Sequence, residues 1–166
     1  DVFVDSTSQK RQRKRQQRKA PVPEVTVFTD GASRGNPGLA SCAAVIMDSS
    51  GSVVAQAAKF LGVNITNNVA EYEGLSLGMD LAKTKGHHKG PILFCMDSEL
   101  VLKQVEGSYK VKAVGLKKLW QQVLDDAKHF EHAEYKHVPR AENYLSDALA
   151  NQAIDEHLEN TAKKQE

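Results

Sequence analysis

The chain has 166 residues, of which 40% are hydrophobic and 26% charged, so it can bury one domain-sized core and is not a wholly disordered protein. Its longest apolar run, residues 39–47, is far too short to cross a bilayer, and two cysteines exclude both a disulfide scaffold and a four-cysteine zinc site. The net charge of +1 hides an asymmetry, because residues 1–20 carry seven Lys or Arg against two Asp while the rest of the chain is mildly acidic.

The first 22 residues are predicted to be a disordered basic tail. No apolar residue occurs between Asp5 and Lys19, so this stretch cannot bury enough surface to offset the loss of chain entropy. It also lacks the apolar core of a secretory signal. Because a run of cations attracts polyanions, we expect the tail to contact nucleic acid; a nuclear address and a solvated linker are the alternatives.

Three strands are predicted next. Residues 24–30 alternate apolar and polar side chains, which is the period of a strand. Residues 31–38 have the composition of a loop, and second and third strands are expected at 39–48 and 52–62. The connections are short, so these strands are predicted to form an antiparallel meander.

The rest of the chain alternates between helices and strands. Helical spacing of apolar residues predicts a helix over 68–85, with Asn67 or Asn68 as its N-cap. The further elements expected are a buried strand at 91–97, helices at 98–106 and 116–127, a strand at 131–138, a C-terminal helix at 145–158 and a polar tail at 159–166. This order predicts one α/β domain over residues 23–158, with helices on the faces of a mixed sheet.

Four carboxylates fall at the ends of the expected elements. Asp30 is placed at the end of the first strand and Asp97 at the end of the fourth. If these strands are parallel neighbours, both acids lie at the carboxyl edge of the sheet, where open α/β sheets bind ligands. Glu71, in the first turn of the first long helix, and Asp147, near the start of the last, can face the same edge.

Such a group of acids needs protons or cations to coexist. Their hard oxygen ligands suit magnesium or manganese rather than zinc, and two such ions about 4 Å apart serve in-line phosphoryl displacement. Each acid alone has a structural explanation: Asp30 suits a turn and Asp147 suits a helix N-terminus. It is the pattern of four that indicates a site.

The segments that carry these acids resemble the signature segments of a known family. TDGASRGNPG, TNNVAEYEGL, CMDSELV and ENYLSDALA are similar, in order and spacing, to the four signatures of type 1 ribonuclease H, within the ribonuclease H-like superfamily. The likeness runs from about Glu24 to Ile154 and is greatest to compact archaeal and retroelement-associated forms. It implies a ribonuclease H-like α/β fold, with a five-stranded mixed sheet of three antiparallel strands followed by two parallel ones, flanked by helices.

The resemblance also implies an activity. Asp30, Glu71, Asp97 and Asp147 match the family's catalytic metal ligands, which hold two Mg²⁺ ions, with Mn²⁺ as a possible substitute. The family is a hydrolase that cleaves the RNA strand of RNA–DNA hybrids internally, through a metal-activated water, and leaves a 5′-phosphate and a 3′-hydroxyl. The expected partner is therefore an RNA–DNA hybrid.

Further positions match the family's substrate contacts. A hybrid duplex presents 2′-hydroxyls along a wide, shallow minor groove, which amide and hydroxyl side chains can both donate to and accept from. The matching positions are Asn36, Asn67, Asn68 and Ser98 for the groove and Thr66 for a phosphate. The asparagines have structural explanations as a turn residue and an N-cap.

The chain also departs from the family pattern. Arg140 stands where many relatives carry a loop histidine; it cannot act as a base and is expected to bind a phosphate. His137 is placed in the preceding strand and outside the expected catalytic set. Glu99 replaces the glutamine of many relatives, which disfavours a contact with a polyanion there. Four lysines occupy the region of the basic insertion of larger enzymes and either contact nucleic acid or form a solvated face: Lys110, Lys112, Lys117 and Lys118.

Two other functions compete with this hypothesis. One is a non-catalytic nucleic-acid-binding module of a reverse transcriptase or an RNA-processing complex; four intact carboxylates argue against it. The other is a superfamily nuclease that acts on DNA, against which the asparagine pair argues. We expect no membrane association, a monomer or a domain of a larger protein, and an intracellular location in the cytoplasm, nucleus or an organelle.

Overall fold

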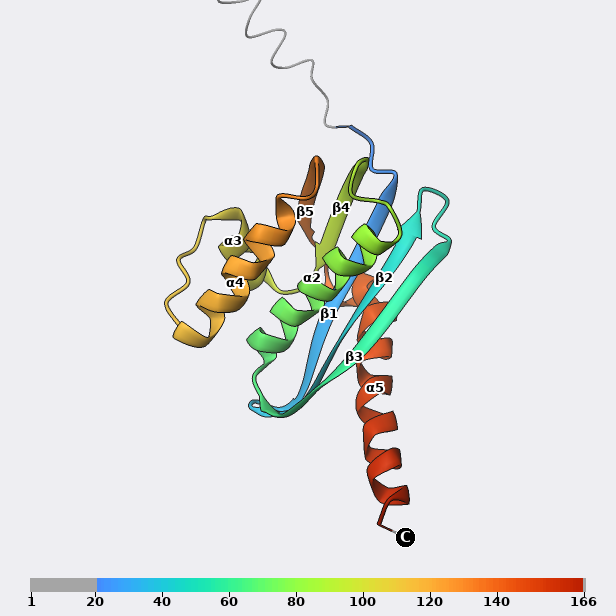
Figure 1. Cartoon of the computed structure of the whole chain (residues 1–166), viewed down its shortest axis with the longest axis vertical. Helices are drawn as coiled ribbons and strands as arrows, with labels where there is room; N and C mark the ends of the chain where they lie inside the picture. The colour runs from blue at the N-terminus through green and yellow to red at the C-terminus, as the bar shows by residue number, and fades with distance from the viewer. Residues whose placement is uncertain (1–20, 166) are drawn as a thin grey trace, which may run out of the picture.

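The computed structural model describes residues 21–165, so residues 1–20, which make up nearly all of the predicted basic tail, lie outside the described part. Five strands form one sheet in the order β3-β2-β1-β4-β5, with helices on both of its faces (Figure 1). The strands are β1 (Val25–Gly35), β2 (Gly38–Asp48), β3 (Val53–Ile65), β4 (Pro91–Met96) and β5 (His132–His137). The helices are α2 (Asn67–Thr84), α3 (Glu99–Glu106), α4 (Val114–Ala127), the 3-10 helix η1 (Arg140–Asn143) and α5 (Tyr144–Lys163).

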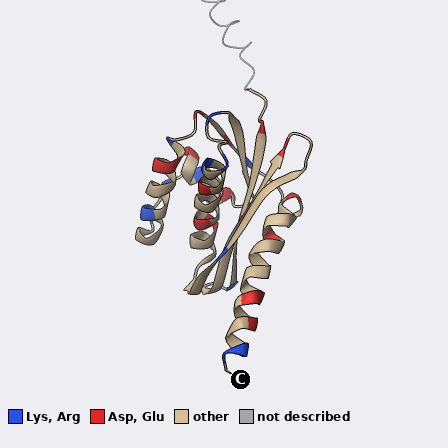
Figure 2. Ribbon diagram, turned by 45° about the vertical axis from the view of Figure 1, so that its right-hand side comes forward, with Lys and Arg blue, Asp and Glu red and all other residues tan. Residues whose placement is uncertain are grey.

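The pairing confirms the predicted mixed sheet. Strands β1, β2 and β3 are antiparallel neighbours, and β4 and β5 add in parallel on the other side of β1. The near-continuous apolar run of β2 follows from its position, since residues from Ala40 to Ile46 are buried on both faces of the sheet. One face packs against α2, and the Ser41 hydroxyl on the other donates to the Ala150 carbonyl of α5. The strands carry few charged residues, whereas the helices carry most of them (Figure 2).

Several predicted boundaries were wrong. The glycine-rich segment expected as a loop at 31–38 is mostly strand, because β1 continues to Gly35 and β2 starts at Gly38. Backbone pairing from Gly31 with Cys42 to Gly35 with Gly38 overrides the loop-like composition. Asp30 therefore lies inside β1 and not at its end. Strand β3 likewise extends beyond residue 62, and α5 beyond residue 158, so most of the expected polar tail is helical and exposed.

The start of α2 also differs from the prediction. Its N-cap is Thr66, whose Oγ1 accepts a hydrogen bond from the Val69 N–H at 3.3 Å, and not Asn67 or Asn68. The helix then begins at Asn67, which places Glu71 in the second turn and not in the first.

Two glycines let α2 cross β1 at backbone contact. A Cβ atom on Gly31 would lie 2.2 Å from the Ala70 carbonyl carbon, and one on Gly74 would lie 2.6 Å from the Asp30 carbonyl oxygen. Any larger residue would hold the helix away from the strand. This close crossing brings Glu71 beside Asp30. None of the helices described combines the length and hydropathy of a membrane-spanning segment.

Candidate active site

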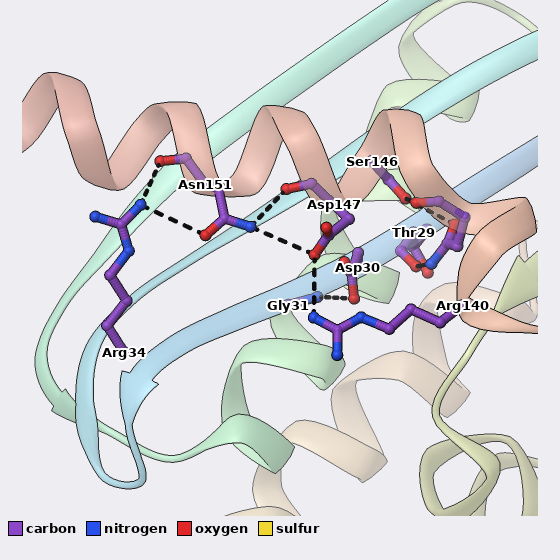
Figure 3. A network of polar contacts seen from close by, with 9 residues as sticks. Thr29, Asp30, Gly31, Arg34, Arg140, Ser146, Asp147 and Asn151 are labelled. Carbon is purple, nitrogen blue, oxygen red and sulfur yellow. Dashed lines mark hydrogen bonds and ion pairs between the residues drawn. The ribbon is translucent and has the colours of Figure 1, made fainter.

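All four predicted acids line one cleft of about 570 Å³. Carboxylate oxygens of Asp30, Glu71 and Asp97 lie within 4.8 Å of one another. Asp147 reaches the same cleft from α5, beside Asp30 (Figure 3). Among residues 21–165, Asp30, Glu71 and Asp97 form the one group of three metal-ligand side chains this close together.

The parallel pairing of β1 with β4 places the first two acids. The last register pair is Phe28 with Cys95, and Asp30 and Asp97 each follow it by two residues. Beyond this point β1 pairs only with β2, so its other side opens into the cleft. The strand neighbours predicted from the sequence are therefore present, although Asp30 lies within a longer strand.

Asn143 fixes the start of α5 against β1. Its side chain is 1% exposed, and its Nδ2 donates to the Thr29 carbonyl at 2.9 Å. The Ser146 hydroxyl donates to Asn143 Oδ1 at 2.7 Å and closes the first turn. These bonds place Asp147 next to Asp30. The sequence reasoning missed Asn143; its signal was a polar residue inside a signature segment with no predicted role.

Burial and mutual repulsion raise the pKa values of the clustered acids and so disfavour their charged forms. Burial, reinforced by the neighbouring Asp97, raises the pKa of Asp30 from its ordinary 3.8 to about 8. Burial also raises the pKa of Glu71 well above its usual value, with Asp30 and Asp97 adding to the effect. The pKa of Asp97 is raised mainly by burial and further by Asp147, while Arg140 opposes the shift. A bound cation would relieve this cost.

The donor set fits a divalent metal ion. Each of the clustered side chains offers carboxylate oxygens, and neither cysteine nor histidine belongs to the group. Oxygen-only ligands suit hard cations such as Mg²⁺ and Mn²⁺ and do not suit zinc. The buried, mutually repelling carboxylates therefore have the chemistry of a magnesium or manganese site.

Most of the predicted substrate contacts lie in the same cleft, which is lined also by Asn67, Asn68, Ser98 and Arg140. Asn36 and Thr66 are not among its lining residues but border it. Asn36 Oδ1 accepts a hydrogen bond from the Asn67 N–H at 3.1 Å, and Thr66 caps α2. Ser98 caps α3 by accepting from the Val101 N–H at 3.3 Å. Ser98 thus forms part of the cleft lining, whereas Asn36 and Thr66 support the start of α2 beside it. Each of the three still has a side-chain donor for a substrate.

Two basic side chains approach the acids from the end of β5. Arg140 is 82% exposed, and its Nη2 lies 4.0 Å from Asp147 Oδ1. His137 is the last residue of β5, as predicted, yet it lines the cleft, and its Nε2 lies 3.1 Å from the Asp97 carbonyl oxygen. The structure therefore places His137 closer to the acids than the sequence indicated.

The raised pKa of Asp30 predicts how the stability of the ion-free protein depends on pH. Between about pH 4 and pH 8 the folded state keeps the Asp30 proton and the unfolded state has lost it. The free energy of unfolding should therefore fall as pH rises through this range. Urea titrations in a chelator at several pH values test this. Asp30→Asn should make the slope shallower and stabilise the protein near pH 8, by about 1.4 kcal/mol per unit of pKa difference removed. Identical slopes for both proteins would contradict the assignment.

Comparison with known proteins agrees with this geometry. The family described as "Reverse transcriptase-like" matches residues 28–153. Bifunctional protein Rv2228c of Mycobacterium tuberculosis is 43% identical over 132 residues, which are 80% of this chain and 36% of that protein; the chain thus spans about a third of that relative's length.

Two solved structures extend the comparison. RNase H1 from the archaeon Halobacterium salinarum is 36% identical, with a TM-score of 0.75 over 80% of this chain and 98% of that one. LC11-RNase H1, solved in complex with an RNA/DNA hybrid, is 34% identical, with a TM-score of 0.76 over 81% and 99%. With the sheet order and the acids in place, the chain belongs to the ribonuclease H-like superfamily.

Proposed function

We propose that this chain is an endoribonuclease that hydrolyses the RNA strand of RNA–DNA hybrids with two Mg²⁺ ions, for which Mn²⁺ can substitute. The observation that carries the proposal is the convergence of Asp30, Glu71 and Asp97 within 4.8 Å, with Asp147 in the same cleft. The likeness to LC11-RNase H1, solved with an RNA/DNA hybrid, supports the substrate class.

The four carboxylates would hold the ions. When bound, the ions would acidify the attacking water and stabilise the negative charge that develops on the phosphate. The chain itself contributes rigidity, because Asp30 pairs with Ala43 inside the sheet and Asp97 directly follows β4. Glu71 is held by the glycine contact between α2 and β1. The chain also buries Asp30, which is 3% exposed, and this burial disfavours the charged carboxylate unless a cation is bound.

Polar side chains that line the cleft can orient the substrate. Arg140 is exposed and next to Asp147, so its guanidinium can bind a phosphate oxygen close to the acids. Asn67 and Asn68, at the start of α2, line the same cleft, where their amides can hydrogen-bond 2′-hydroxyls. The products would carry a 5′-phosphate and a 3′-hydroxyl.

Incubation with three labelled duplexes tests the function. With Mg²⁺ we expect cleavage of the RNA strand of a hybrid, little cleavage of duplex RNA or duplex DNA, and none in a chelator. Equal cleavage of duplex DNA would assign a DNA nuclease. Hybrid binding without cleavage, in either Mg²⁺ or Mn²⁺, would assign a non-catalytic module.

The asparagine pair makes a prediction about affinity. Replacing both Asn67 and Asn68 with Ala should weaken hybrid binding by about 1–3 kcal/mol, the scale for a lost hydrogen bond whose partner stays unsatisfied. The fold should persist, because the α2 cap uses the Thr66 side chain and the Asn67 backbone N–H. Binding is measured with Ca²⁺ replacing Mg²⁺. Asn160→Ala, on the exposed end of α5, is the matched control and should have no effect. Equal affinity of the double variant and the control would remove the pair from the substrate contacts.

A further inference from the structure

A chain of hydrogen bonds links the outer end of β1 to Asp147 (Figure 3). Arg34 Nη1 pairs with Asp155 Oδ1 at 2.8 Å. Its Nη2 donates to Asn151, at 3.3 Å to the carbonyl oxygen and 3.5 Å to Oδ1. Asn151 Nδ2 in turn donates to Asp147, at 3.0 Å to the carbonyl oxygen and 3.4 Å to Oδ1. We call Arg34, Asn151 and Asp147 the Arg34 relay, with Asp155 as its anchor.

The chemistry of arginine fixes which way the Asn151 side-chain amide is turned. A guanidinium carries only donors, so the side-chain atom of Asn151 that faces Arg34 must be the oxygen. The Asn151 NH₂ group is then turned toward the Asp147 carboxylate. Asp147, Asn151 and Asp155 follow one another at i, i+4 spacing and so share one face of α5, which lets a single arginine from β1 span a full helical turn.

Asp147 is the acid that most needs such support. Asp30 lies within β1, Asp97 directly follows β4, and Glu71 is held by the contact of α2 with β1. Their oxygens form a tight group to which Asp147 does not belong. The Asp147 side chain is 32% exposed. Its Oδ1 has Arg140 4.0 Å away on one side and Asn151 on the other.

We propose that Arg34 and Asn151 are positioning residues that hold the Asp147 carboxylate toward the divalent ions, Arg34 acting through Asn151. This inference rests on the proposed function. Two other roles for Arg34 are distinguishable from it. The residue lines the cleft and could bind a substrate phosphate directly, or its pair with Asp155 could be an ordinary surface ion pair, which contributes about 0–1 kcal/mol to stability.

Calorimetric titration with Ca²⁺ tests the relay without needing cleavage. Asn151→Ala should weaken Ca²⁺ binding roughly tenfold, the lower range for loss of a group that orients a metal ligand. Arg34→Lys keeps the charge but loses the fork that contacts Asp155 and Asn151 together, so it should weaken binding about threefold. Lys128→Arg exchanges the cation of an exposed ion pair with Asp125 outside the cleft lining, and should change nothing.

A double variant separates the relay from two independent effects. If Arg34 acts through Asn151, then Arg34→Lys in the Asn151→Ala background should produce no further loss of Ca²⁺ affinity. Losses that multiply would overturn the relay. Unchanged Ca²⁺ affinity in folded Arg34→Lys would also overturn it. If Asn151→Ala fails to fold, Asn151→Gln, which keeps an amide at a shifted position, takes its place in both experiments.

Steady-state kinetics on the hybrid supply the second readout. Arg34→Lys should lower kcat at fixed, subsaturating Mg²⁺ and leave the KM for hybrid unchanged. A raised KM for hybrid with normal Ca²⁺ affinity would assign Arg34 to direct phosphate contact and overturn the proposal. If the parent protein binds Ca²⁺ and shows the expected losses but cleaves no hybrid, the positioning role stands and the proposed function fails.

Discussion

Asp97→Asn should abolish measurable cleavage of RNA–DNA hybrid while leaving the protein folded. The Asp97 carboxylate belongs to the group of oxygens within 4.8 Å, and a neutral amide cannot replace its charge toward two divalent ions. Losing about 4 kcal/mol of the charge stabilisation that the ions provide corresponds to a roughly thousandfold slower reaction. The change also relieves repulsion among the acids, so the ion-free protein should be no less stable than the parent.

Cleavage rate, Ca²⁺ affinity and thermal unfolding are measured together on this variant. Asp125→Asn serves as the control, because it removes an exposed acid from α4 with the same change in net charge. The control should keep the parent's rate. Cleavage by Asp97→Asn at a rate near the parent's would show that the four acids are not the ion site. If Asp97→Asn does not fold, Asp30→Asn takes its place in the same measurements.

Gly31→Ala should disrupt both the fold and the site. The added Cβ would lie 2.2 Å from the Ala70 carbonyl carbon and 2.3 Å from the Glu71 nitrogen, and both are backbone atoms that no rotamer change can move. Overpacking of a core usually costs about 1–3 kcal/mol, and a clash between two backbones belongs at or above the upper end of that range. The folded fraction should also bind Ca²⁺ poorly, since α2 can make room only by carrying Glu71 away from Asp30.

Gly115→Ala is the matched substitution for comparison. Gly115 lies in the first turn of α4, where an added Cβ would meet no other element within 4 Å, so alanine should stabilise the helix by up to about 1 kcal/mol. Urea unfolding measures both variants. If Gly31→Ala were as stable as the parent, the contact between α2 and β1 would not be as close as the structure has it.

The sequence sufficed to identify most of the strands and helices because its signals were local, whereas the pairing of all five strands followed only from the family resemblance. Alternation in residues 24–30, the apolar run of β2 and helical spacing after Asn68 each identify an element on their own. The extent of β1 was not predictable in this way, because residues 31–35 have loop composition and become strand only through pairing with β2. Tertiary context overrode local preference there. At the start of α2, Thr66 and the two asparagines are all good N-caps, so residue type alone could not choose among them.

For the site, the sequence identified which acids cluster in space but not which residues position their side chains. Asp30 and Asp97 could be paired because parallel strands end at one edge. Arg34, Asn143 and Asn151 could not be assigned, since their roles depend on contacts across more than a hundred residues of chain, such as Asn143 with Thr29. A polar residue in a helix or loop has many possible partners, and only the three-dimensional structure selects one.

The long separation between the acids along the chain has a consequence for the order in which the protein acquires its site. Strands β1 to β3 and helix α2 are contiguous and joined by short turns, so they can pair while later residues are still being synthesised. Asp97 arrives only when β4 inserts beside β1, and Asp147 only when α5 docks on the far face. A nascent chain that still lacks its last helix therefore holds an incomplete set of the four carboxylates, and we expect the proposed activity to require the complete domain.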